Sequence, residues 1–275
     1  MTTYVPKDVP SALMRQTLLD RELVRPVDDK PVVRLLPWLN VVALGGHAII
    51  DRGRAVIEPV VAELRAAMQV HRLLILTGAG IRARHVLGVG LDLGLPTGVL
   101  AGLASSEAEQ NGHLIASLLA ADGVSYIPHG TAAHQLASHL MAASAVVSNA
   151  WPPFGLYELP PALGKIPPHR SDAGAFLLAD AYGAARVVYV KGDQGIHTGP
   201  DRTERVSAAE LLTRDHTTLP VEPSALSLLR RAKNVREFRV VDGLEAGNIT
   251  RALAGEDVGM VVTAEEDRRR PTRAR

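Results

Sequence analysis

The stretches VVALGG at residues 41–46 and LLILTGAG at residues 73–80 decide the fold class of this chain. Each is a short apolar run that ends in glycines, which is typical of a buried strand followed by a tight turn. A segment with helical periodicity comes after each turn, and from Arg54 to Met68 the apolar residues fall on one helix face. Repeated strand–turn–helix units predict a parallel sheet, and ligands of such sheets bind beyond the carboxyl ends of the strands.

The same alternation continues along the chain and predicts a mostly parallel sheet with helices on both faces. Further strands are expected at 124–127, 145–148, 187–190, 238–241 and 260–263, and further helices at 82–91, 107–121, 132–142, 172–182, 208–213, 223–232 and 248–253. Asp172 is expected to cap the helix that it begins. We expect three parts: an N-terminal arm at residues 1–33, an α/β domain at 34–263, and a charged, disordered tail at 264–275.

The composition excludes several classes of function. The chain has 275 residues, 47% hydrophobic and 21% charged, and a net charge of +1, so nothing indicates a nucleic acid or an acidic membrane as partner. It has no cysteine, which excludes disulfides and thiolate metal sites. Neither a signal peptide nor an apolar run long enough to cross a bilayer is visible, so we expect a soluble, cytoplasmic protein.

Residues at the ends of the first strands are candidates for an anion site. The backbone N–H groups of a glycine turn can approach an anion closely, a helix N-terminus adds a favourable dipole, and arginine or lysine adds charge. A single glycine turn is as often only a tight connection, and each basic side chain could simply face solvent. Two turns at one sheet edge together favour a polyphosphate or a similar oxyanion. The candidates are Gly45, Gly46, His47, Thr77, Gly78, Ala79, Gly80, Arg82 (with Arg84 and His85 beside it) and Lys191.

The histidines form no metal motif of their own. His129, His134 and His139 are spaced by five residues, which places neighbours on different faces of a helix. Taken alone, each is more typical of a surface or packing residue than of a metal ligand. His47, directly after the first glycine pair, is the most suggestive histidine by its position.

The order of these segments resembles the amino acid kinase family, nearest its uridylate kinase branch. The matching segments are 42–46, 74–80, 172–175, and Lys191 with 194–198. Longer runs resemble the molybdenum-storage-protein family within that class, at 34–39, 73–98, 166–172, 241–244 and 252–256. The resemblance spans residues 13–263 and implies the amino acid kinase fold, a three-layer αβα sandwich with a mostly parallel central sheet.

The resemblance also implies ligands and partners. Members of that family form hexameric cages, bind ATP with Mg²⁺, and store molybdate as polyoxomolybdate clusters. We therefore expect a homo- or hetero-hexamer with a related subunit, and tungstate in place of molybdate stays open. The nucleotide phosphates are expected at the two glycine turns, with Lys191, Asp193, Gln194 and Gly195 near the nucleotide. His129 and His139 are the candidate metal contacts, and His139 matches a histidine that touches a metal cluster in one subunit type.

Three departures from the family pattern bear on activity. Ala43 stands where the family usually has a lysine, Gln194 and His197 replace an aspartate and a tyrosine, and no histidine follows Pro152-Pro153. A phosphoryl-transfer site without that lysine loses stabilisation of developing charge, so we expect no catalytic residue and at most weak ATPase activity. Two alternatives stay open: a nucleoside-monophosphate or amino-acid kinase, and a catalytically silent partner subunit of the cage.

Overall fold

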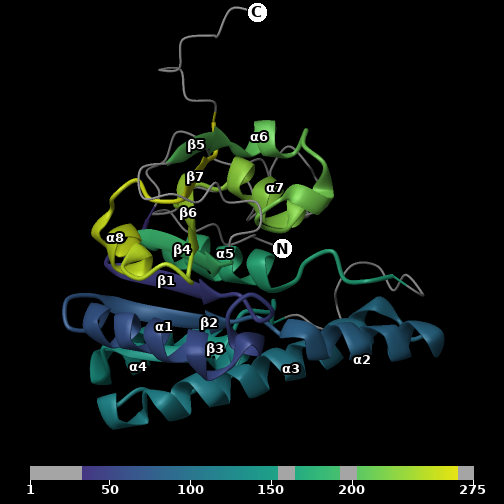
Figure 1. The fold of residues 1–275 in the computed structure, drawn as a ribbon, viewed down its shortest axis with the longest axis horizontal. Coiled ribbons are helices and arrows are strands. Elements are labelled where there is room, and N and C mark those ends of the chain that lie inside the picture. The colour runs from purple at the N-terminus through teal and green to yellow at the C-terminus, as the bar shows by residue number, and fades with distance from the viewer. Residues whose placement is uncertain (1–32, 154–164, 193–202, 266–275) are drawn as a thin grey trace, which may run out of the picture. The chain divides into compact units, whose positions relative to one another are not determined.

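The computed structural model describes residues 33–153, 165–192 and 203–265 (Figure 1). The chain divides into two units, Met1–Val33 and Arg34–Arg275, and only Val33 of the first unit falls in the described part. The expected arm therefore lies outside the described residues apart from Val33, as do Asp193, Gln194, Gly195 and all of the expected tail after Glu265.

A mostly parallel sheet forms the centre of the second unit, as the sequence predicts. Within the described residues it has seven strands in the order β3-β2-β1-β4-β6-β7-β5. Neighbouring strands are parallel except for β6 and β7, which are antiparallel. The strands are β1 (Leu39–Leu44), β2 (Arg72–Thr77), β3 (Ala145–Asn149), β4 (Arg186–Lys191), β5 (Glu204–Ser207), β6 (Glu237–Asp242) and β7 (Met260–Thr263).

Helices pack on both faces of the sheet, which confirms the three-layer αβα sandwich (Figure 1). Val42 and Leu44 of β1 belong to the core under α1, α8 and the end of α3, whereas Val41 and Ala43 belong to the core under α4, α5, α6 and α7. This alternation is the period of two expected of a strand buried on both faces. The helices are α1 (Arg54–Ala67), α2 (Gly80–Asp92), α3 (Thr97–Leu118), α4 (His129–Ala142), α5 (Ser171–Tyr182), α6 (Ala208–Leu211), α7 (Pro223–Arg231) and α8 (Asn248–Ala254), with short 3₁₀ turns η2 (Ile50–Arg52), η3 (Ala120–Asp122) and η5 (His216–Thr218).

A third, smaller core joins α2 to α3, which lie side by side (Figure 1). Ala83 and Leu87 of α2 pack there with Leu100, Ala104 and Ala108 of α3. The amino-terminal half of α3 is rich in alanine, glycine and serine, so its apolar pattern is weak, and the sequence analysis began this helix ten residues too late. Small side chains still suffice here because they let the two helices approach closely.

Two expectations about the strands are corrected. Residues 124–127 form no strand, and Tyr126 makes only an isolated bridge to Val147 of β3. The edge strand β5 was not predicted, because it has only four residues and one buried aliphatic side chain, Val206. No helix in the described part of the chain is long and apolar enough to cross a membrane.

Candidate functional site

The two glycine turns predicted from the sequence touch each other at the carboxyl ends of β1 and β2. Leu44 pairs with Thr77 in the parallel register, so the residues that follow them meet. A Cβ atom added to Gly46 would lie 2.2 Å from the Gly80 nitrogen and 2.7 Å from the Gly78 oxygen, and one added to Gly78 would lie 2.9 Å from the Gly46 nitrogen. Neither Gly46 nor Gly78 has a positive φ. Glycine is therefore required at both positions by the close approach of the two backbones and not by an unusual backbone conformation.

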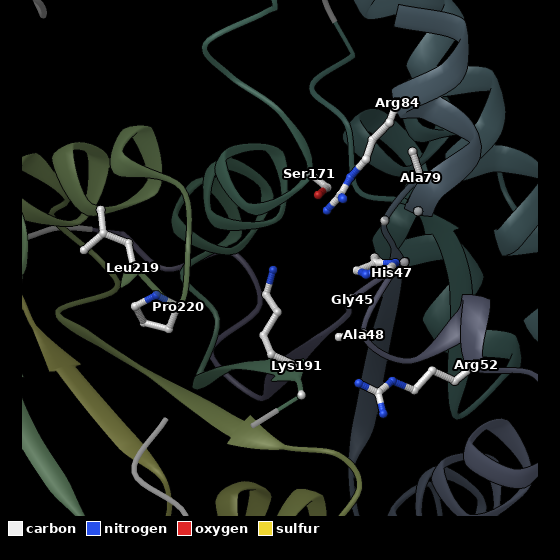
Figure 2. A pocket seen from close by; sticks show the side chains of 14 residues that line it. Gly45, His47, Ala48, Arg52, Ala79, Arg84, Ser171, Lys191, Leu219 and Pro220 are labelled. Atoms are coloured by element: carbon white, nitrogen blue, oxygen red, sulfur yellow. The ribbon is translucent and has the colours of Figure 1, made fainter. Parts of the chain in front are cut away.

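A cavity of about 300 Å³ opens beside this contact (Figure 2). Of the residues expected at a nucleotide, seven line it: Gly45, Gly46, His47, Gly78, Ala79, Gly80 and Lys191. Arg84, named beside Arg82 in the sequence, also lines the cavity. The remaining lining residues were not predicted; they are Ala48, Arg52, Ser171, Gly192, Leu219 and Pro220. Thus the cavity is built from the ends of β1, β2 and β4, the start of α5, and the segment before α7.

Backbone N–H groups of the first turn are available at this cavity. Gly45 donates to the Val190 oxygen at 2.9 Å, and Asp51 donates to the Gly46 oxygen at 2.8 Å, which fixes the turn on both sides. Between them, the N–H groups of His47 and Ala48 have no hydrogen-bond acceptor among the described residues. Consecutive free N–H groups of this kind form the concave site that binds anions in many proteins.

Three cationic side chains point toward the cavity from three different elements: Lys191 from the end of β4, Arg84 from α2, and Arg52 from η2 (Figure 2). Lys191 Nζ donates to Asp172 Oδ1 at 2.6 Å. No described carboxylate pairs with Arg52 or Arg84. Two guanidinium groups without a carboxylate partner in the described part of the chain, together with a lysine, give the cavity the charge and the donor geometry that a polyphosphate requires.

Two other predicted residues support the site from behind and do not line it. Arg82 bonds to Glu107 at 3.0 Å and to Asn111, whose side-chain amide donates to the Gly78 oxygen at 2.7 Å. Thr77 is fully buried and donates to the Ala108 oxygen at 2.8 Å. Both therefore anchor the second glycine turn to α3, and their contact with a nucleotide stays a prediction.

The start of α2 already holds a carboxylate of the chain itself. Asp51 Oδ2 accepts a hydrogen bond from the Ile81 N–H at 2.6 Å and lies 3.6 Å from His47 Nδ1. A Cβ atom at Gly80 would fall 2.6 Å from the Asp51 carboxylate, and Gly80 has a φ of +75°. The helix N-terminus is thus compensated internally, so an anion in the cavity would rely on the turn amides and the cations.

Glu222, which the sequence analysis did not select, lies beneath the same cavity. Its carboxylate accepts hydrogen bonds from the N–H groups of Arg170, Asp172 and Ala173 at 3.0, 3.2 and 3.3 Å, so it caps α5. Asp172 was expected to cap its own helix, but its side chain pairs with Lys191 instead. Burial and the neighbouring Asp172 carboxylate raise the pKa of Glu222 to about 7.

The two candidate metal-contacting histidines lie on α4 and do not line the cavity. His129 Nδ1 is 2.7 Å from Asn149 Oδ1 and 3.4 Å from Ser105 Oγ, while His139 lies ten residues further along the helix, half-buried. The described residues contain no group of three or more His, Asp or Glu side chains that could hold a metal ion.

Comparisons with known proteins agree with this architecture. The sequence model of the amino acid kinase family matches residues 38–242, and the chain belongs to that family. A curated relative from Azotobacter vinelandii, molybdenum storage protein subunit beta, is 42% identical over 259 residues, which cover 92% of this chain and 96% of the relative.

Solved structures with a similar fold are uridylate kinases. The Archaeoglobus fulgidus enzyme has a TM-score of 0.61 at 19% identity and is matched over 82% of this chain and 99% of its own. The UMP kinase of Bacillus anthracis has a TM-score of 0.60 at 16% identity, with 84% and 98% of the two chains covered. At these identities the likeness shows the fold alone.

Proposed function

We propose that this chain is a subunit of a molybdenum storage protein that binds ATP with Mg²⁺ and helps to store molybdate as polyoxomolybdate clusters in an oligomeric cage. The observation that carries the proposal is the 42% identity to a molybdenum storage protein subunit over nearly the full length of both chains. The relative is by its name one subunit of a larger protein, which supports assembly with a related subunit as a homo- or hetero-hexamer. The cytoplasmic location stays a prediction.

The cavity at the glycine turns is the proposed nucleotide site. Its free amides at His47 and Ala48 suit phosphate oxygens, and Arg52, Arg84 and Lys191 supply positive charge around them. Asp193, Gln194 and Gly195 follow Lys191 and remain proposed contacts outside the described residues. A magnesium ion usually keeps several waters and binds through one or two carboxylates and the phosphates, so it would enter with the nucleotide.

The cluster site is proposed less directly. We propose that a polyoxomolybdate cluster is held by contacts from more than one subunit of the cage. His129 and His139 remain the proposed contacts of this chain, and of the two His129 is held more firmly, by Asn149 and Ser105. Tungstate has the same oxyanion chemistry and would compete for the same space.

A working kinase is the alternative that the fold alone would favour. Ala43 argues against it, because the residue is 5% exposed in the core face of β1 and places no charge near the cavity. A silent partner subunit remains the second alternative.

Elemental and nucleotide analysis of the purified protein tests the proposal. The chain would be produced in molybdate-rich medium, alone and together with a related subunit, and its molybdenum, tungsten and nucleotide content measured. We expect molybdenum far above one atom per subunit in the oligomer, and bound ATP that is lost in Gly78→Val. Bound nucleotide without molybdenum in either preparation would favour the silent partner, and ATP turnover at ordinary kinase rates would favour the kinase.

A further inference from the structure

The N-termini of α5 and α7 are joined by two carboxylates that cap each other's backbone. Glu222 accepts hydrogen bonds from three N–H groups at the start of α5, and the N–H of Glu222 donates to Asp172 Oδ2 at 3.1 Å. The two residues are fifty positions apart in the sequence, so this reciprocal contact fixes the segment before α7 against the start of α5.

The same pair controls a cation of the cavity. Asp172 holds Lys191 Nζ through Oδ1 while its other oxygen binds the Glu222 backbone, so the two ends of one carboxylate link Lys191 to Glu222. Leu219 and Pro220, just before Glu222, and Ser171, just before Asp172, line the cavity themselves. The wall of the cavity and its lysine therefore depend on one contact.

The charge of this cluster depends on the protonation of Glu222. The charged or titratable groups that face it are Asp172 and Arg170 at the start of α5, and Lys191 and Tyr189 from β4. When Glu222 is neutral, Asp172 and Lys191 balance each other and the Arg170 charge is free to attract an anion. When Glu222 is ionised, the cluster gains a negative charge beneath the cavity, which opposes a bound polyanion.

We propose that Glu222 is a positioning residue of the anion cavity, which acts through Asp172 to fix the place of Lys191 and the net charge that a bound polyphosphate meets. The inference rests on the proposed function in one respect, namely that the cavity binds polyphosphate. It adds that the affinity is set by a buried carboxylate that never touches the ligand.

The test compares the dissociation constants of ATP–Mg²⁺ and inorganic tripolyphosphate for the parent and Glu222→Gln between pH 6 and pH 8.5. The ratio of the two proteins at each pH cancels any pH dependence that the ligand and the rest of the protein contribute to both. We expect equal affinities at pH 6 and about tenfold tighter binding by Glu222→Gln at pH 8.5, because only the parent gains the opposing charge. A ratio that is the same at every pH would mean a purely structural Glu222 and would overturn the proposal.

Glu63→Gln is the matched control. Glu63 of α1 also caps a helix, by accepting from the N–H groups of Gly247 and Thr250 at 2.5 and 3.1 Å, but its hydrogen bonds go to the start of α8 and not to Asp172, which holds Lys191. Its ratio to the parent should stay near one at every pH. Failure of the parent to bind either ligand at any pH would refute the proposed nucleotide site itself, which is a different result from a flat ratio.

A second measurement covers the case in which Glu222→Gln does not fold. His47→Gln removes the histidine that lines the cavity, and sulfate keeps a constant charge over this pH range. In this variant the sulfate concentration that protects against thermal unfolding should rise about tenfold from pH 6 to pH 8.5. A constant value would overturn the role given to Glu222.

Discussion

Replacing Gly46 by alanine should separate the two glycine turns and weaken anion binding at the cavity. The added Cβ would lie 2.2 Å from the Gly80 nitrogen, whereas an ordinary contact needs at least 3.4 Å. The turns must therefore part by about 1.2 Å, the difference between these two distances. The atoms in the way belong to the backbone of Gly78 and Gly80, so no side-chain rotation can relieve the contact.

Two effects should follow from that separation. Forcing one carbon into a packed contact costs about 1–3 kcal/mol of folding free energy. We expect a cost at the upper end of this range, because the atoms that must move belong to the backbone. A hydrogen bond to a charged group contributes about 1.5–3 kcal/mol, so misplacing even one turn amide weakens phosphate binding about 10- to 100-fold. The affinity for phosphate should therefore fall by more than the loss of folding free energy alone can explain.

Calorimetric titration with ATP–Mg²⁺ and thermal unfolding measure the two effects separately. Gly102→Ala is the control, because a Cβ at this position of α3 meets nothing within 4 Å, and it should leave affinity unchanged while stabilising the helix by about 0.5–1 kcal/mol. Gly78→Val, whose Cβ lies 2.9 Å from the Gly46 nitrogen, should repeat the loss of binding. If Gly46→Ala binds ATP as tightly as the parent, the reasoning from the turn contact is wrong.

Three further changes test separate parts of the site. Arg84→Gln should weaken polyphosphate binding about tenfold with little loss of stability, because Arg84 lines the cavity. Arg82→Gln should cost about 1–3 kcal/mol of stability through Asn111 and change the affinity less. Calorimetric titration and thermal unfolding measure both, and a larger loss of affinity in Arg82→Gln than in Arg84→Gln would contradict these roles. A folded Ala43→Lys should turn over ATP faster than the parent, whereas the uncharged control Ala43→Met should not. Equal turnover in the parent and in folded Ala43→Lys would contradict the inference that a missing charge at position 43 limits the rate. The raised pKa of Glu222 means that folding stability falls as pH rises from about 4.5 to 7, by about 3 kcal/mol, and denaturant titration of Glu222→Gln should lack this fall.

The fold and the glycine turns could be predicted because their signals are local. An apolar run that ends in glycine predicts both a buried strand and a backbone that something approaches, and β1 and β2 show both. The helix at Arg54 was expected with almost the observed bounds since its apolar face is complete. The weak pattern of α3 and the four residues of β5 carried too little signal for the same reasoning.

The side chains of the site were harder to predict, because their roles depend on which way each element faces. Arg82 and Arg84 are two residues apart on α2, which separates them by about 200° around the helix. The sequence shows that the two arginines lie on opposite faces of the helix, but only the packing of α2 on α3 decides that Arg84 is the one that faces the cavity. Glu222 had no local signal at all, since its partner Asp172 lies fifty residues earlier.

The arrangement of charges supports retention of a nucleotide over its turnover. Both helix N-termini beside the cavity are compensated from within, α2 by Asp51 and α5 by Glu222, so the attraction for phosphate comes from turn amides and from Arg52, Arg84 and Lys191. Such groups stabilise the bound reactant as much as the transition state, and uniform binding of this kind tightens the complex without raising the rate. Acceleration needs a charge that meets the phosphoryl group only as it moves, and at position 43, where the family resemblance implies a lysine, the chain has a buried methyl group. A chain with these turn amides and without this charge fits the storage function proposed above better than it fits phosphoryl transfer.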